Sequence, residues 1–108
     1  LFAAAPAYAG HQIKNSITGK IFIGSSVDVN ARINRHKAGF AFLDSHEIPG
    51  LIADVKKYGA ESFPFEVLET LEGEYDSDAG LCEDLKLLEQ MWLEKCEPFG
   101  ERGYNTQT

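Results

Sequence analysis

Apolar and polar positions along the chain change their spacing several times, and each change marks a boundary between predicted elements. Loose alternation over 8–14 predicts a strand, and the apolar run KIFIG at 20–24 predicts a second one. Turn residues from Asn15 to Gly19 separate the two, so residues 8–25 are interpreted as a β-hairpin. The segment FPFEVLET at 63–70 is rich in aromatic and β-branched residues and predicts a third strand.

Two helices are predicted between the hairpin and the third strand. The first spans about 28–38, where Ser25 or Ser26 is the candidate N-cap and Gly39 ends the helix. Pro49 suits the first turn of the second helix, which Gly59 closes.

A last helix is predicted over about 81–96, after an acidic loop at 72–80 and before Pro98. The complete order of elements is therefore ββααβα. This order predicts an α+β domain with a small, three-stranded, mostly antiparallel sheet flanked by helices.

The last predicted helix carries one apolar stripe, formed at intervals of three or four positions by Leu81, Leu85, Leu88, Trp92 and Cys96. At about 100° per residue, Glu89 lies about 60° from the centre of this stripe, at the margin of the core. A half-buried carboxylate is costly unless it is paired or binds a metal ion. A structural salt bridge and a ligand or metal role are both open for Glu89 at this point.

The first predicted helix also carries polar residues at the margin of its apolar face. Val29 and Ile33 mark its apolar face, and His36 projects between their directions. Arg32 and His36 are four positions apart, so their side chains are neighbours on one surface. Together they are suited to clamp a phosphate, since Arg offers a planar donor fork and His a proton-active partner. The alternative is an Arg whose stem packs while its head reaches water, beside a structural core His.

A length of 108 residues, with 44% hydrophobic and 25% charged residues, indicates one soluble domain with a single core. No apolar run approaches the roughly 20 residues that span a bilayer, so no membrane partner is expected. Cys82 and Cys96 share one predicted helix and would lie about 21 Å apart, which excludes a disulfide between them. Both are interpreted as reduced, apolar filler residues.

The first residues, LFAAAPAYAG, contain a small-x-small pattern at Ala7-Tyr8-Ala9 that is typical of signal cleavage sites. The basic segment of a secretory signal is absent, which favours a lead-in at 1–7 to the first strand. We expect a cytoplasmic protein with one domain over 1–108, or a secreted or periplasmic one if residues 1–9 are a signal remnant.

The net charge of −7 is unevenly distributed along the chain. Residues 1–60 carry seven Lys or Arg and four Asp or Glu, a balance of +3, whereas residues 61–108 carry three and thirteen, a balance of −10. Overall acidity disfavours nucleic-acid binding, but an anionic ligand would be attracted to the first half of the chain.

Taken in order, these segments resemble the GIY-YIG nucleases, and the resemblance covers about residues 9–105. Phe22-Ile23-Gly24 stands at the second signature triplet, after a Gly-Lys turn and before a serine pair. KKYGAESFPFEVLE looks like the family's helix-end and third-strand segment, and LLEQMWLEKCEPFGERGYN like its closing signature. The pattern is most similar to that of phage and intron-encoded members, and it implies the GIY-YIG domain fold.

The resemblance implies hydrolysis of DNA phosphodiester bonds with Mg²⁺, or with Mn²⁺ in its place. Glu89 matches the metal-ligand position and would hold one ion. Arg32 and His36 match an Arg-x-x-x-His motif, in which the Arg would neutralise charge on the phosphate and the His would position or protonate neighbouring groups. Asn105 matches a terminal Asn that would brace the site, and His46 falls where some members carry another active-site histidine.

Two departures from the family pattern concern its tyrosines. The first signature falls on Ala9-Gly10-His11, so His11 replaces one tyrosine, and Phe22 replaces the other. One of these tyrosines is proposed in the family to help deprotonate the attacking water, which Phe22 cannot do. A neutral imidazole with a pKa near about 6.5 is a better base at pH 7 than a phenol near about 10. We therefore expect His11 to be the general base, the alternative being an edge-strand residue without a task.

Substrate contacts are expected from the second signature triplet and from the basic residues of the first half. Phe22, Gly24 and Ser25 would form one wall of the phosphodiester site. Salt-sensitive DNA binding is expected through Lys14, Lys20, Arg32, Arg35 and Lys37.

Two other functions remain open at this point. The lost tyrosines and the charge of −7 also fit a catalytically impaired domain that binds nucleic acid or a protein partner. A nuclease that acts on RNA or on structured DNA is the other alternative. The sequence indicates no particular oligomeric state.

Overall fold

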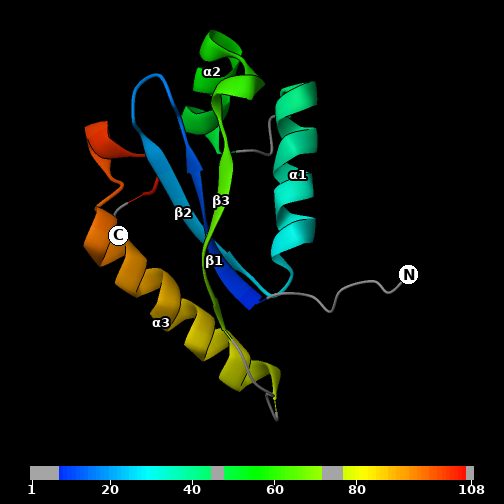
Figure 1. Ribbon diagram of the computed structural model, residues 1–108, viewed down its shortest axis with the longest axis vertical. Helices are drawn as coiled ribbons and strands as arrows, with labels where there is room; N and C mark the ends of the chain where they lie inside the picture. The colour runs from blue at the N-terminus through cyan, green and yellow to red at the C-terminus, as the bar shows by residue number, and fades with distance from the viewer. Residues whose placement is uncertain (1–7, 45–47, 72–76, 107–108) are drawn as a thin grey trace.

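The computed structural model describes residues 8–44, 48–71 and 77–106. Figure 1 shows the helices and strands, which follow the predicted order ββααβα. They are β1 (Tyr8–Lys14), β2 (Ile21–Ser26), α1 (Val29–Phe42), α2 (Pro49–Tyr58), β3 (Phe65–Leu71) and α3 (Asp78–Cys96). Short 3₁₀ turns follow α2 at Ala60–Ser62 and α3 at Gly100–Arg102. The predicted α+β class is confirmed.

The three strands form one sheet in the order β2-β1-β3, and both pairings are antiparallel. β1 is therefore the central strand, which contradicts the alternative of His11 as an edge-strand residue. His11 pairs with Gly24 on β2, and the register towards β3 shifts between Gly10 and His11. In Figure 1, α1 and α3 lie on opposite sides of this sheet.

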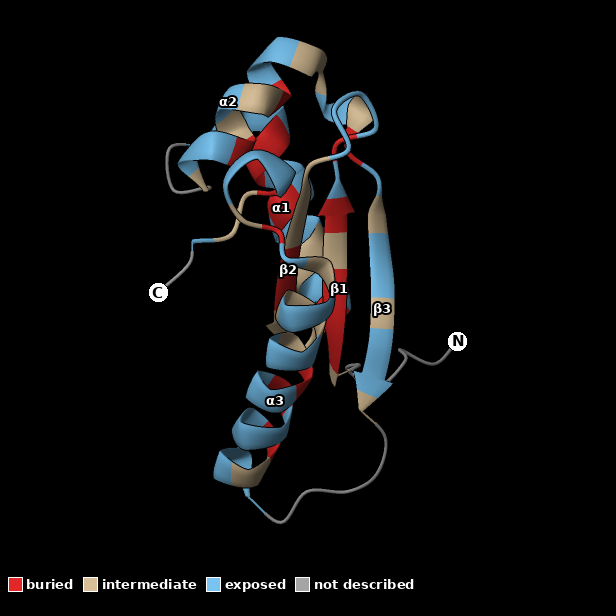
Figure 2. Ribbon diagram, turned by 90° about the vertical axis from the view of Figure 1, so that its left-hand side faces the viewer, coloured by how far each residue is buried: buried red, intermediate tan, exposed pale blue. Residues whose placement is uncertain are grey.

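Apolar residues fill both faces of the sheet. One cluster, beneath α1 and α2, comprises Ile13, Phe40, Leu51, Val55 and Phe63. On the other face, the buried part of the α3 stripe is formed by Leu81, Leu85 and Leu88. Figure 2 shows that buried residues are concentrated in β1, whereas β3 is largely exposed. The central strand is thus the element that both helical layers cover.

Both ends of α1 differ from the prediction. Its N-cap is Asp28, whose side chain accepts a hydrogen bond from the backbone N–H of Ala31 at 3.1 Å. The Ser26 hydroxyl instead accepts from the backbone N–H of Asp28, so it orders the turn before the helix. The helix also does not end at Gly39 but continues to Phe42. It ends there because the next residue, Leu43, adopts the left-handed conformation (φ 51°).

The start of α3 also lies earlier than predicted. Ser77 is the N-cap and accepts a hydrogen bond from the backbone N–H of Gly80, so residues 78–80 belong to the helix rather than to an acidic loop. Cys82 and Cys96 are both free thiols, but Cys82 is exposed, and its interpretation as apolar filler is wrong.

Among the described residues, no helix has the length and apolar character needed to cross a membrane. The lead-in at 1–7 and His46 lie outside the described residues.

Candidate functional site

A pocket of about 320 Å³ lies beside β2, between the sheet, α1 and α3. It brings together side chains or backbone from distant parts of the chain: His11, Phe22, Gly24, Ser25, Arg32, Arg35, His36, Ile48 and Glu89. Every one of these except Ile48 is a residue for which the sequence predicts a catalytic or substrate-binding role. Ile48, an apolar residue just before α2, carried no signal in the sequence that would have placed it here.

His11 is the deepest side chain of the pocket, with 1% of its surface exposed. Its ring lies 5.8 Å from the His36 ring and 6.4 Å from the Phe22 ring, measured between centroids. A Cβ at Gly24 would lie 2.9 Å from Cε1 of His11, so the cross-strand partner must be a glycine for the imidazole to fit. Neither ring nitrogen of His11 has a hydrogen-bond partner among the residues that the structure describes. Such buried groups are costly to leave unpaired, which points to a ligand or water in the pocket.

The pKa of His11 is lowered to about 4, first by burial and then by the nearby positive charges of His36 and Arg32. The imidazole is therefore neutral at pH 7 and able to accept a proton. It is a weaker base than the free imidazole assumed from the sequence, because its surroundings disfavour the imidazolium.

Burial of neutral His11 makes stability depend on pH. Between the unfolded pKa of 6.5 and the folded pKa of about 4, the unfolded chain binds more protons at His11 than the folded one does. The contribution of His11 to the free energy of unfolding is therefore intact above pH 6.5. It falls as the pH is lowered towards 4, by about 3 kcal/mol in total.

We expect His11→Phe to remove this dependence, since phenylalanine has a similar shape and does not titrate. Urea unfolding of both proteins between pH 4 and 7 measures the effect, and the many carboxylates they share cancel in the difference. Parallel stability curves for the two proteins would contradict the burial of a neutral imidazole.

Glu89 lines the same pocket as His11, from α3, and is half-buried. Burial raises the pKa of its carboxyl group, while hydrogen bonds from the Ser25 side chain and backbone and the charge of Arg32 oppose that shift. The carboxylate is thus held by Ser25 of β2 at the rim of the core.

The α1 side of the pocket is positively charged. Arg32 is half-buried, Arg35 is exposed, and His36 is buried with its ring stacked on Phe65 at 6.3 Å and 28°. Arg32 and His36 occupy successive turns, as their spacing predicts. Two guanidinium groups and an imidazole on one wall, with a carboxylate opposite, form a site that attracts an anion and leaves one oxygen ligand for a cation.

Asn105 lies beside the pocket rather than in its wall. Its side-chain amide donates to the backbone carbonyl of Ile23 at 2.8 Å, and its side-chain carbonyl accepts from the backbone N–H of Ile23 at 2.9 Å. These two bonds attach the C-terminal segment to β2 one residue before Gly24. The hydrogen bonds expected of a bracing residue are present.

The predicted basic contacts separate into two groups. Arg32 and Arg35 line the pocket, whereas the three lysines do not. The Lys20 ammonium lies 5.6 Å from the Tyr104 ring, and the Lys37 ammonium lies 5.7 Å from the Phe65 ring. Lys14 is exposed at the end of β1.

Among the described residues that line this pocket, Glu89 provides the one carboxylate. Within residues 8–44, 48–71 and 77–106, no cluster of three or more His, Cys, Asp or Glu side chains is suited to hold a metal ion. Mg²⁺ is commonly bound by one or two carboxylates and keeps several waters, with substrate phosphate completing its shell. Glu89, at the edge of an open pocket, fits that mode of binding.

No family model and no curated protein matches the sequence. Two solved structures share its fold. The catalytic domain of homing endonuclease I-TevI matches with a TM-score of 0.67 and 23% identity, over 94% of this chain and 99% of that one. A glutamate-to-alanine mutant of the catalytic domain of intron endonuclease I-TevI matches with a TM-score of 0.68 and 24% identity, over 92% of each chain. At this level of identity the likeness concerns the fold, and it confirms that the chain has the fold of a GIY-YIG catalytic domain.

Proposed function

We propose that this domain is a metal-dependent endonuclease that hydrolyses DNA phosphodiester bonds. The observation that carries the proposal is the convergence of His11, Arg32, His36 and Glu89 on one pocket. These side chains come from β1, α1 and α3, and the fold that gathers them is similar to the catalytic domain of an endonuclease.

In this proposal the cationic wall binds the scissile phosphate. Arg32 neutralises the charge that develops on the phosphoryl oxygens, in a half-buried position where such an interaction is stronger than in water. His36 positions or protonates the neighbouring groups. Glu89 is the residue that would hold Mg²⁺, which would supply Lewis-acid polarisation of the phosphate and support for the leaving group.

His11 is the proposed general base. It is neutral at pH 7, its ring nitrogens have no partner within the described part of the chain, and Phe22 beside it has no hydroxyl group to compete for that role. A bound phosphate would raise the pKa of His11, because a nearby negative charge favours the imidazolium. Substrate binding would thus strengthen the base when it is needed.

The second candidate is a domain that binds nucleic acid without cutting it. It is favoured by the low pKa of His11 in the unliganded domain. The net charge of −7 favours the form of this candidate that binds a protein partner instead of nucleic acid. RNA and structured DNA are the alternative substrates of the first candidate. The cytoplasm remains the proposed location.

Incubation with supercoiled plasmid and with single-stranded DNA tests the proposed function. We expect nicked or cut product with Mg²⁺ or Mn²⁺ and none with EDTA, measured on gels between pH 6 and 9. DNA binding without product at every pH would favour the non-catalytic candidate. Cleavage of RNA or branched DNA in preference to plasmid would change the assigned substrate.

A further inference from the structure

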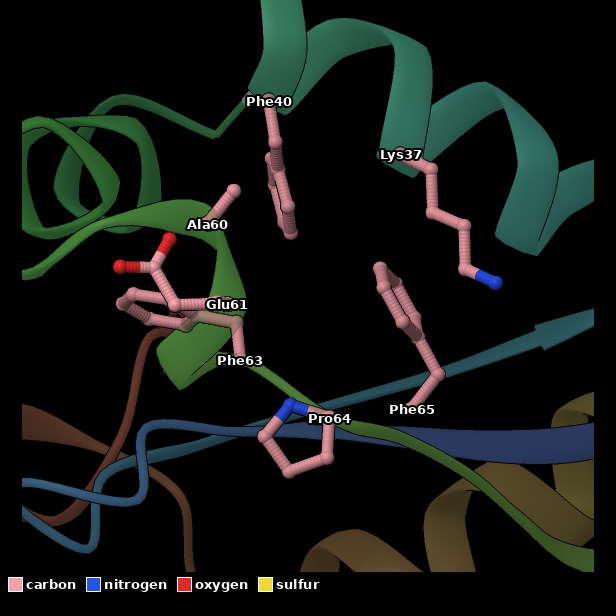
Figure 3. Close-up of a pocket in the computed structure, with 7 residues that line it drawn as sticks. All are labelled: Lys37, Phe40, Ala60, Glu61, Phe63, Pro64 and Phe65. Carbon is pink, nitrogen blue, oxygen red and sulfur yellow. The ribbon is translucent and has the colours of Figure 1, made fainter.

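A second pocket, of about 440 Å³, lies between α1 and the start of β3 and takes no part in the proposed chemistry. Figure 3 shows the residues that line it: Lys37, Phe40, Ala60, Glu61, Phe63, Pro64 and Phe65. Phe40 extends from α1 towards the pocket, and Phe65 extends from β3 on the opposite side.

Aromatic rings form the walls of this pocket. The Phe40 and Phe65 rings are 5.7 Å apart with an angle of 23°, and the Phe40 and Phe63 rings are 6.0 Å apart with an angle of 61°. Phe40 and Phe63 are buried, but Phe65 is only half-buried, so part of this residue is exposed where it lines the pocket. The pocket therefore offers a planar apolar surface, the Phe65 ring, whose position is fixed by packing against the buried Phe40 ring.

The charged groups lie at opposite ends of the pocket. The Lys37 ammonium is 5.7 Å from the centre of the Phe65 ring, and Figure 3 shows it beyond the Phe65 side, while the Glu61 carboxylate lies at the other end. A ligand that stacks on Phe65 with an anionic group beside it would match the position of Lys37. A nucleotide has this combination of a flat base and a phosphate.

The two pockets share a wall. His36 lines the proposed catalytic pocket, and its ring is stacked on Phe65, 6.3 Å away, which lines the second pocket. Phe40 lies one turn further along α1 than His36. The two pockets therefore adjoin, and one strand of DNA that lies in the first could reach the second.

We propose that this second pocket is a nucleobase subsite, which takes an unpaired base of the DNA strand close to the phosphate in the catalytic pocket. Phe65 is the stacking surface and Lys37 contacts the adjoining phosphate. The proposal rests on the nuclease function proposed above. Because a paired base must first leave the duplex stack, the subsite favours single-stranded, bulged or flapped DNA near the cut.

The test compares two single-stranded DNA oligonucleotides of equal length, one with natural bases and one abasic throughout, bound to the protein in EDTA. The backbone charge is the same, so the ratio of the two dissociation constants reports base recognition. We expect the wild-type protein to bind the natural strand roughly tenfold more tightly than the abasic one. Phe65→Leu, which keeps an apolar side chain but removes the ring, is expected to bring this ratio close to one.

Two further variants keep the test independent of folding. Phe42→Leu removes a ring that is 85% exposed on α1, the helix that carries Lys37, and that lies outside both pockets, so its ratio should equal that of the wild type. Phe65→Trp enlarges the stacking surface and should keep or increase the ratio. A ratio that falls in Phe65→Trp would overturn the stacking role even if Phe65→Leu does not fold.

The plasmid assay separates the two proposals. If the wild-type protein cuts plasmid while Phe65→Leu keeps the tenfold preference for bases, the subsite is wrong and the nuclease stands. If the wild-type protein neither cuts nor binds DNA, both proposals are overturned. Tighter binding of the matching RNA strand than of the DNA strand would overturn the assignment to DNA.

Discussion

Replacing Glu89 with glutamine is expected to reduce the rate of Mg²⁺-dependent plasmid nicking at least about 1000-fold. Glu89 is the carboxylate of the pocket, and an amide is a poor ligand for Mg²⁺ in its place. Electrostatic stabilisation by a bound metal ion contributes several kcal/mol in phosphoryl chemistry, and about 4 kcal/mol corresponds to this factor. Initial rates of nicking at saturating Mg²⁺ measure the effect.

The same substitution is not expected to unfold the domain. Burial raises the pKa of Glu89, so its ionised form is held at some cost to stability, and a neutral amide of the same shape avoids that cost. The free energy of unfolding of Glu89→Gln at pH 7 should equal or exceed that of the wild type. An inactive variant that is no less stable would distinguish a catalytic carboxylate from a structural one.

Glu83→Gln is the matched control, because Glu83 is an exposed carboxylate on the same helix and its loss changes the net charge equally. Removing one negative charge from a protein of net charge −7 slightly favours DNA binding, and this effect is common to both variants. Nicking by Glu89→Gln within tenfold of Glu83→Gln would contradict the metal-binding assignment.

The order of elements could be predicted from the sequence because each boundary has a local cause. Turn residues separate β1 from β2, Pro49 opens α2, and the aromatic and β-branched run forms β3. The errors are at helix ends where several capping residues compete. Asp28 rather than a serine caps α1, and Ser77 starts α3 three residues earlier than its apolar stripe indicates.

Helical periodicity places Arg32, His36 and Glu89 each at the margin of an apolar face, and the resemblance to the GIY-YIG nucleases implies that they share one site. The depth of His11 could not be predicted. Strand alternation gives the face on which a side chain lies, but β1 becomes the central strand only when β3 pairs with it. The lowering of the His11 pKa to about 4 follows mainly from that burial, and no local sequence pattern indicates it.

The second pocket was missed for a related reason. Phe40 continues the Arg32 and His36 row by one turn, but it lies beyond Gly39, where the sequence predicts the end of α1. Phe65 reaches this row only through the packing of β3 against α1. An apolar residue in a strand is usually part of the core. For Phe65, only the partial exposure of the residue beside Lys37 indicates a role at the surface.

Replacing His11 with phenylalanine is expected to reduce the nicking rate at pH 7 between about 100- and 10,000-fold, the range of general-base catalysis. Phenylalanine fills the same space between Gly24, His36 and Phe22 but cannot accept a proton. The variant should lose less stability than the wild type between pH 7 and pH 4. Its free energy of unfolding at pH 7 shows whether a loss of activity reflects a loss of structure. Single-turnover nicking rates measure the chemical step.

The pH profile separates loss of the base from a disturbed pocket. With its pKa at about 4 in the free domain, His11 is already deprotonated above pH 6. Titration of this group therefore does not change the kcat/KM of the wild type between pH 6 and 8. Without the base, hydroxide must act in its place, and the rate of His11→Phe should rise about tenfold per pH unit. His11→Tyr provides a phenol, with a pKa near about 10, and should move the rising part of the profile to alkaline pH. A level profile for His11→Phe at a near wild-type rate would exclude His11 as the base and leave the activation of water to another group.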